Sequence, residues 1–382
     1  MVNNKFAVFY IEPLVLRNKI IHNKETQHNM KIKLAILEKD LSYLNRIVSV
    51  FSTKYADKFE IYSFTDPNVA ISSLKDTKID VLIANDVFEI NVENLPKRCG
   101  FAYFVDSADI DTKNDQRAIC KFQKADLIYK QILSVYSENA GNISKLKIDE
   151  GSAKIAVFSS PCGGTGTSTL AAACAMHFAA KGRKTIYLNL EKFGSSDSFF
   201  SADGQFDMSD ISFALKSRKT NLSIKLESCV KQDASGVFFY SQPKVALDVI
   251  ELNAEDIIHL ISEIELSGQY EYIIVDLDFS IGEDALKILR NAHSVVWVGD
   301  GSDVSNLKIS RALQSLSISD TKSDSPLINR IHLVYNKFSN RTGKVLTNIE
   351  LKNIGGMPKY EHATTDQVLK QIFPMDMLEK VF

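Results

Sequence analysis

A glycine-rich segment near the middle of the chain has the residue types and spacing of a phosphate-binding loop. It reads KIAVFSSPCGGTGTSTLAAACA over residues 154–175, which predicts a strand, a glycine loop and an alanine-rich helix. In such a loop, backbone N–H groups and the positive end of the following helix hold the anion. The residues expected to contact phosphate are Gly163, Gly164, Thr165, Gly166, Thr167, Ser168 and Thr169.

Two side chains with oxygen ligands are expected to bind a magnesium ion at this site. The hydroxyl of Ser168 stands where a P-loop coordinates Mg²⁺, and Asp276 ends the apolar run YIIVD of residues 272–276. Both groups are ligands that Mg²⁺ accepts, directly or through water. The loop departs from G-x-x-x-x-G-K-[ST], because Pro161 replaces the first glycine and Thr167 replaces the lysine. A plain glycine turn is the alternative for the loop alone, and a strand-end cap is the alternative for Asp276.

The loop resembles the deviant P-loop of the ParA/MinD superfamily, K-G-G-x-G-K-[ST]-[ST]. The string CGGTGTST, residues 162–169, keeps the glycines and the two final hydroxyl residues but has Cys162 and Thr167 in place of the lysines. In that superfamily the first lysine reaches the nucleotide of a partner subunit, and the second contacts the bound phosphates. The resemblance implies ATP as the ligand and a homodimer as the assembly.

Three further segments resemble the same superfamily, in the same order. YLNLEKFG resembles D-x-D-x-x-F-G, with Asn189 and Glu191 in place of aspartates, and Glu191 is the one catalytic candidate. VYNKF and GMPKYEH resemble the segments around the nucleotide base, which makes Asn336 and Pro358 candidates for adenine contact. The alternatives are an exposed loop position for Glu191 and a turn for Asn336.

The missing lysines affect hydrolysis more than binding. Loss of one group that stabilises transition-state charge slows a reaction roughly 10²–10³-fold. Here two cations are absent and Asn189 replaces an acid. The amide loop, the helix dipole, Ser168 and Asp276 remain to hold a triphosphate with Mg²⁺. We therefore expect binding of ATP and Mg²⁺ with weak or absent turnover, so that the nucleotide acts as a structural or switching ligand.

Polar residues at strand ends in the first half of the chain resemble the site of a response-regulator receiver domain. Glu38 and Asp40 follow the first expected strand, and Lys121 follows the fifth. The phosphoacceptor position falls on Asn85, which cannot form an acyl phosphate as an aspartate does. We predict a pseudo-receiver that serves for contacts; the rival alignment takes Asp86 as the acceptor.

The elements that must position these residues alternate between strand and helix. Strands are expected at residues 32–37, 59–64, 79–84, 101–105 and 118–122, then at 154–158, 184–190, 237–240, 271–276, 294–298 and 330–335. Helices are expected at 40–54, from Pro67, and at 125–136, 168–181, 207–230, 254–267 and 303–316. This predicts an α/β protein with two doubly wound domains, a receiver-like (flavodoxin-like) domain and a ParA/MinD-type P-loop domain. The expected order is an extension at 1–29, the receiver-like domain at 30–137, a linker at 138–152 and the P-loop domain at 153–382.

Composition limits the class of protein further. The 382 residues carry a formal net charge of −2, which argues against a dedicated nucleic-acid binder. The five cysteines have no C-x-x-C spacing and fit free thiols in a reducing, cytoplasmic compartment. No apolar stretch is long enough to span a membrane, so membrane contact would be indirect. The final stretch, 365–382, is broken by Pro374 and is expected to pack on the domain core. Met1 and Met30 are both candidate start residues.

A receiver-like domain joined to a ParA/MinD-type domain resembles the TadZ/CpaE family of pilus-assembly localisation proteins. The resemblance covers about residues 30–382, and the lysine-free loop resembles an atypical TadZ subgroup that binds ATP. It implies a polar hub near the inner membrane that recruits Tad/Flp-type pilus (secretion) proteins. The alternatives are an active ParA/MinD-like ATPase that positions cargo and a receiver-controlled signalling output protein.

Overall fold

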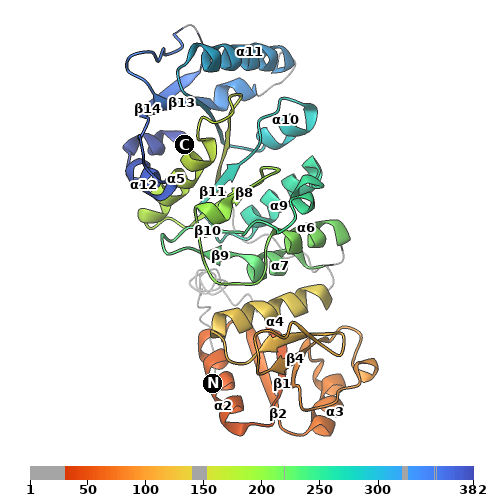
Figure 1. Cartoon of the computed structure of the whole chain (residues 1–382). Coiled ribbons are helices and arrows are strands. Elements are labelled where there is room, and N and C mark those ends of the chain that lie inside the picture. The colour runs from red at the N-terminus through yellow and green to blue at the C-terminus, as the bar shows by residue number, and fades with distance from the viewer. Residues whose placement is uncertain (1–30, 140–152, 219, 321–325, 348, 350) are drawn as a thin grey trace, which may run out of the picture.

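Two mostly parallel sheets, each with helices on both faces, form the computed structural model of the chain (Figure 1). The structure describes residues 31–139, 153–218, 220–320, 326–347, 349 and 351–382. The predicted extension at 1–29 and most of the predicted linker at 138–152 lie outside the described residues. The predicted fold class, two doubly wound α/β domains, is confirmed.

The N-terminal sheet has the strand order β2-β1-β3-β4-β6-β5, and only β5 runs antiparallel to its neighbour. Its strands are β1 (Ile32–Leu37), β2 (Phe59–Phe64), β3 (Val81–Asn85), β4 (Gly100–Val105), β5 (Thr112–Lys113) and β6 (Gln116–Cys120). Its helices are α2 (Leu41–Lys54), α3 (Pro67–Thr77) and α4 (Ala125–Asn139), with a 3₁₀ turn η1 (Val92–Asn94). Buried residues of α2 and α4 pack on one face of the sheet and those of α3 on the other.

The C-terminal sheet has the order β14-β13-β12-β7-β11-β8-β10-β9, with β9 alone antiparallel to its neighbour. Its strands are β7 (Lys154–Ser159), β8 (Thr185–Asn189), β9 (Lys231–Gln232), β10 (Phe238–Phe239), β11 (Tyr272–Asp276), β12 (Ser294–Gly299), β13 (Ile331–Phe338) and β14 (Lys352–Pro358). Its helices are α5 (Thr167–Ala180), α6 (Met208–Ser217), α7 (Leu222–Cys229), α8 (Leu247–Ile250), α9 (Ala254–Leu266), α10 (Glu283–Leu289), α11 (Asp303–Asp320) and α12 (Thr365–Ile372). Three 3₁₀ turns are η2 (Ser196–Ser198), η3 (Leu327–Arg330) and η4 (Asp376–Val381).

Alternation along the central strands builds the three layers of this domain. On β7, Ile155 and Val157 pack with residues of α6, α9 and α11, whereas Ala156 and Phe158 pack with α5 and α12. The chain moves outward from β7 to β8 on one side and from β12 to β13 on the other. The loop after β7 therefore lies where the strand order reverses, which is where open α/β sheets bind ligands.

Some predicted elements differ from the structure. The predicted helix over 207–230 is two helices, because Arg218 takes a left-handed φ of 52° and the Asn221 side chain accepts from the Ile224 N–H at 3.2 Å to begin α7. Helix α4 continues to Asn139, beyond the predicted end at residue 136. Strands β5, β9 and β14 were not predicted, because β5 and β9 have two residues each and β14 contains Gly355 and Gly356 in place of an alternating pattern.

The C-terminal stretch packs on the domain core, as predicted. Leu369 and Ile372 of α12 and Leu378 and Val381 of η4 are buried in the cluster that includes the α5 face of the sheet. Within the described ranges, no helix is both long and apolar enough to cross a membrane.

Helices α4 and α7 join the two domains (Figure 1). The ammonium of Lys225, a buried residue of α7, donates to the Ser134 hydroxyl at 2.9 Å and to Asp210 at 3.1 Å. The Glu227 carboxylate accepts from the Tyr129 hydroxyl at 2.6 Å and from Lys58 at 2.7 Å. These polar contacts fix α7 against the N-terminal domain.

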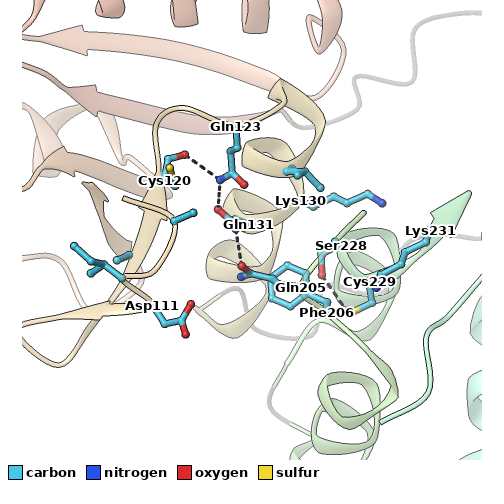
Figure 2. Close-up of a pocket in the computed structure, with 15 residues that line it drawn as sticks. Asp111, Cys120, Gln123, Lys130, Gln131, Gln205, Phe206, Ser228, Cys229 and Lys231 are labelled. Atoms are coloured by element: carbon cyan, nitrogen blue, oxygen red, sulfur yellow. Dashed lines mark hydrogen bonds between the residues drawn. The ribbon is translucent and has the colours of Figure 1, made fainter. Parts of the chain in front are cut away.

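A cavity of about 330 Å³ lies beside this junction (Figure 2). Side-chain amides bridge it, because Gln123 donates to Gln131 at 2.9 Å and Gln131 donates to Gln205 at 2.7 Å. Lys130 donates to the carbonyl of Val230, the C-terminal cap of α7. The amide chain adds a second set of hydrogen bonds between the domains.

Candidate nucleotide site and receiver site

The glycine loop is held in shape by its own hydroxyl groups. The Ser160 hydroxyl donates to the Val298 carbonyl at 2.5 Å and accepts from the Cys162 N–H at 3.0 Å, and Thr165 donates to the Cys162 carbonyl at 3.1 Å. Gly166 begins α5 in the left-handed region with φ 83°. A Cβ at Gly163 or Gly164 would meet nothing within 4 Å, so the loop tip is open to a ligand.

Cys162 and Thr167, which stand where the resembling motif has lysines, place no positive charge at the loop. Cys162 is 5% exposed, and its Sγ lies 3.4 Å from the Ser305 carbonyl and 3.3 Å from the Ser305 hydroxyl at the start of α11. The Thr167 hydroxyl lies 3.3 Å from the Thr165 hydroxyl inside the loop. Position 162 therefore points into the domain core and not outward.

The first turn of α5 meets a cluster of acids at the ends of β8 and β11. The Ser168 hydroxyl donates to Glu191 Oε2 at 3.1 Å. The Asn189 amide donates to Glu191 Oε2 at 3.2 Å and to Asp276 Oδ2 at 3.2 Å. The Tyr187 hydroxyl donates to Asp276 Oδ2 at 2.9 Å. The structure thus brings Ser168, Glu191 and Asp276 together.

Burial disfavours the ionised form of the Asp276 carboxyl group. Burial, followed by the negative charge of Glu191, raises the pKa of Asp276 well above its ordinary value. Its Oδ1 atom is buried and has no hydrogen-bond partner among the described residues. The pKa of Tyr187 is also raised, first by burial and then by Asp276. A cation beside Oδ1 would favour the ionised carboxylate.

The donor set fits Mg²⁺. The described residues contain no group of three or more His, Cys, Asp or Glu side chains arranged as a metal site. Mg²⁺ needs no such cage, since it keeps several waters and takes one or two carboxylates with phosphate oxygens. Ser168 and Asp276 would hold it, with Glu191 in contact with both residues.

The base-side candidates occupy the ends of β13 and β14. Asn336 is buried, and its amide nitrogen donates to the Thr165 carbonyl of the loop at 2.7 Å. Pro358 is exposed and aligns with Phe338 in the β13–β14 register, so it lies on the same sheet edge as Asn336. The adenine contact of both residues stays a prediction. Sequence reasoning missed Lys337, whose ammonium donates to the Gly164 carbonyl at 2.7 Å.

In the N-terminal domain, three of the four predicted receiver residues come together. Glu38 is fully buried and accepts from the Asn85 amide at 2.6 Å, and Lys121 lies 3.7 Å from its other oxygen. Asp40 instead caps α2, accepting from the N–H groups of Ser42 and Tyr43. Asp40 therefore faces the helix start and not Asn85.

Two charged residues of the receiver site were missed from the sequence. Asp106, directly after β4, pairs with Lys121 at 2.7 Å. Burial lowers the pKa of Lys121, but the hydrogen bond to Asp106 and the charge of Glu38 outweigh burial and raise it. Lys113 of β5 pairs with Asp86 at 2.9 Å. The structure thus buries Asn85, the predicted acceptor position, and leaves the rival Asp86 paired with Lys113 of β5.

A comparison with protein families identifies the N-terminal domain. Residues 30–137 match the family model described as "TadZ-like, receiver domain". The N-terminal domain is a TadZ-like receiver domain. The resemblance to the TadZ/CpaE family is confirmed at this domain, and the match ends within α4, two residues before the helix does.

The chain is also similar to several solved structures. A ParA family ATPase from Chlorobium tepidum TLS is 21% identical, with 61% of this chain and 96% of that chain covered and a TM-score of 0.47. The MinC:MinD cell division protein complex from Aquifex aeolicus is 18% identical, with 60% of this chain and 95% of that chain covered and a TM-score of 0.45. Cobyrinic acid a,c-diamide synthase from Mycobacterium smegmatis, solved with an ATP analogue and magnesium, is 13% identical. The match covers 50% of this chain and 77% of that chain, with a TM-score of 0.39. No curated protein matches the chain. The TadZ-like receiver domain is joined to a second, mostly parallel α/β domain.

Proposed function

We propose that this protein is an ATP-binding localisation and assembly factor for Tad/Flp-type pilus (secretion) machinery. The observation that carries ATP binding is the buried, unpartnered Oδ1 of Asp276, near Ser168 at the start of α5. Burying a carboxylate is costly unless it is paired. The Mg²⁺ of a bound nucleotide is the partner that this position, with an open glycine loop above it, would accept.

The residues of the site divide the work of binding. The loop N–H groups and the first turn of α5 would hold the phosphates, and Ser168 and Asp276 would hold Mg²⁺. Bound Mg²⁺ supplies positive charge to the β- and γ-phosphates. Asn336 would meet the base beside the loop. Turnover is weak or absent in this proposal because Thr167 is neutral and Cys162 is turned into the core.

Calorimetric titration of nucleotide-free protein with MgATP tests the site. The wild type is expected to bind, and Asp276→Asn is expected to lose binding by at least about tenfold, which corresponds to about 1.4 kcal/mol. Asp278→Asn is the matched control, since exposed Asp278 accepts only the Lys192 N–H at 2.8 Å among the contacts described. No heat in the wild type, or equal affinity in Asp276→Asn, would refute the proposal. Turnover near one per second would refute the weak-hydrolysis part alone.

The receiver domain in this proposal is a contact surface and not a phosphorelay module. Support comes from Asn85, which occupies the buried acceptor position, and from Asp86, which is paired with Lys113. Incubation with acetyl phosphate should leave the wild type unlabelled. Labelling that Asp86→Asn abolishes would contradict this role.

We place the protein in the cytoplasm at a cell pole near the inner membrane, as a homodimer that recruits other pilus-assembly proteins. The test is a fluorescent fusion in a piliated host, together with light scattering with and without MgATP. A polar focus and a dimer are expected for the wild type. A diffuse signal with normal pili in a deletion strain would refute the assembly role.

A further inference from the structure

The phosphate loop has lost its lysines, yet one ammonium group reaches it from another strand. Lys337, at the end of β13, donates from Nζ to the Gly164 carbonyl at 2.7 Å. Gly164 is at the open tip of the loop, where an added Cβ would meet no atom within 4 Å. The positive charge therefore sits at the mouth of the site that would hold phosphate.

A β-bulge aims this lysine at the loop. Between Tyr335, which pairs with Gly356, and Phe338, which pairs with Pro358, β13 has one residue more than β14. Lys337 within this bulge has φ 57°, a left-handed conformation that costs a non-glycine residue about 1 kcal/mol or more.

The bulge overrides the alternation of a strand. Successive side chains of a regular strand point to opposite faces. Here Asn336 and Lys337 bind consecutive carbonyls of one loop, those of Thr165 and Gly164, both at 2.7 Å. A backbone distortion that turns two neighbouring side chains onto the same loop is expected at a functional site.

The charge of Lys337 is free to act on a ligand. Among the described residues, no Asp or Glu oxygen lies within 4 Å of its Nζ, whereas Lys344 nearby in sequence pairs with Asp303 at 2.8 Å. An ammonium group has three N–H donors, and the Gly164 carbonyl takes one. The exposed side chain leaves the other donors for an anion.

We propose that Lys337 supplies the bound phosphates with the positive charge that position 167 lacks. This assignment rests on the proposed nucleotide site and identifies a phosphate-contacting residue within it. The lysine comes from the base side of the site, so it favours binding of a polyphosphate without standing where the loop lysine would stabilise transfer. One residue then accounts for retained binding together with weak turnover.

Titration calorimetry with MgATP, magnesium tripolyphosphate and adenosine separates this role from a structural one. Lys337→Gln keeps a donor for the Gly164 carbonyl but loses the charge, Lys337→Met loses both, and Lys337→Arg keeps the charge. We expect Gln and Met to weaken MgATP and tripolyphosphate by about tenfold, in line with a charge-assisted hydrogen bond. Adenosine affinity should change less than about twofold, and Arg should stay within about threefold of wild type.

The control is Lys344→Gln, which removes an exposed lysine that pairs with Asp303 and should leave all three affinities unchanged. Wild-type affinity for MgATP in Lys337→Gln would overturn the assignment while leaving the nucleotide site intact. Equal weakening of adenosine and tripolyphosphate would also overturn it, because it would show that Lys337 only shapes the loop. Failure of the wild type to bind MgATP would remove the proposed function itself.

Discussion

Asp276→Asn should stabilise the ligand-free protein while it removes nucleotide binding. In the structure, Asp276 is fully buried, and its Oδ1 has no hydrogen-bond partner. An asparagine of the same shape can keep its oxygen toward Tyr187 and Asn189, which donate to Asp276 Oδ2 at 2.9 and 3.2 Å. Its amide nitrogen would then occupy the place of Oδ1 as a neutral donor. The substitution removes a buried charge and breaks neither existing hydrogen bond.

The size of the effect follows from the acid group, whose negative charge is opposed by burial and by Glu191. A buried polar group without compensation costs about 1–3 kcal/mol, and the neutral amide avoids a cost of this size. For a domain of this size, each kcal/mol moves the melting temperature by about 2–4 °C, so a rise of roughly 2–12 °C is expected near neutral pH. This gain in stability is opposite in sign to the loss that most buried substitutions cause.

The direction in which the stability difference changes with pH is a second, independent part of the prediction. The pKa of Asp276 is raised in the folded state, whereas an unfolded aspartate titrates near pH 4. Between these two values the folded protein holds a proton that the unfolded chain has lost. The contribution of Asp276 to stability is therefore fully present below pH 4 and is lost as the pH rises toward the raised pKa. The advantage of Asp276→Asn should grow as the pH rises.

Thermal unfolding in nucleotide-free, magnesium-free buffer from pH 5 to 8.5 checks both signs. A lower melting temperature for Asp276→Asn at neutral pH would refute the reasoning, as would a difference that does not change with pH. Added MgATP should then stabilise the wild type and leave the variant unchanged. That crossover would show that the ligand offsets the cost of the buried charge.

Three further outcomes are expected. Thr167→Lys should tighten MgATP binding by about tenfold. In that background Lys337→Gln should hardly change the MgATP affinity, because the effects of two cations at one phosphate group are not additive. Calorimetry of the wild type, the two single variants and the double variant gives the coupling energy between the two positions. Lys225→Met should destabilise the protein by about 2 kcal/mol, measured by denaturant unfolding, since it leaves Asp210 without its partner at the domain junction, although the partly exposed acid limits the loss. Leu378→Ala should cost about 2–5 kcal/mol and lower the melting temperature without changing sedimentation with anionic vesicles, because the C-terminal stretch packs in the core.

Strands and helices with strong periodicity could be predicted from the sequence because local pattern and burial agree there. Runs such as IKLAIL and YIIVD are buried on both faces of a parallel sheet and have little other choice. The misses have local causes. Arg218 breaks a helical pattern by its backbone conformation, and the capping residue Asn221 was the overlooked signal. Strand β14 is recruited by its neighbour β13 and has little pattern of its own.

The residues of the site also fall into those that the sequence motifs indicate and those that only the three-dimensional contacts reveal. The motifs predicted Ser168 and Asp276 as Mg²⁺ ligands and Glu191 as a catalytic candidate. The structure brings the three side chains together at one edge of the sheet, and their roles stay predictions. The roles of Asp106 and Lys337 depend on contacts between segments far apart in the chain, and no single segment encodes these contacts. The same holds for Cys162, whose burial against Ser305 depends on α11.

Two local costs of this fold lie on one edge of the C-terminal sheet. Asp276 at the end of β11 is a buried acid with an unpartnered oxygen, and Lys337 at the end of β13 is a left-handed lysine in a bulge. Each feature lowers the stability of the ligand-free protein. A cation would offset the buried charge of Asp276, and an anion bound at Lys337 would compensate the backbone strain of the bulge with binding energy. A magnesium–polyphosphate complex carries both charges on one ligand. The two costs, on different strands, therefore point to the same occupant, and loss of the loop lysines leaves that occupant bound without making it a good substrate.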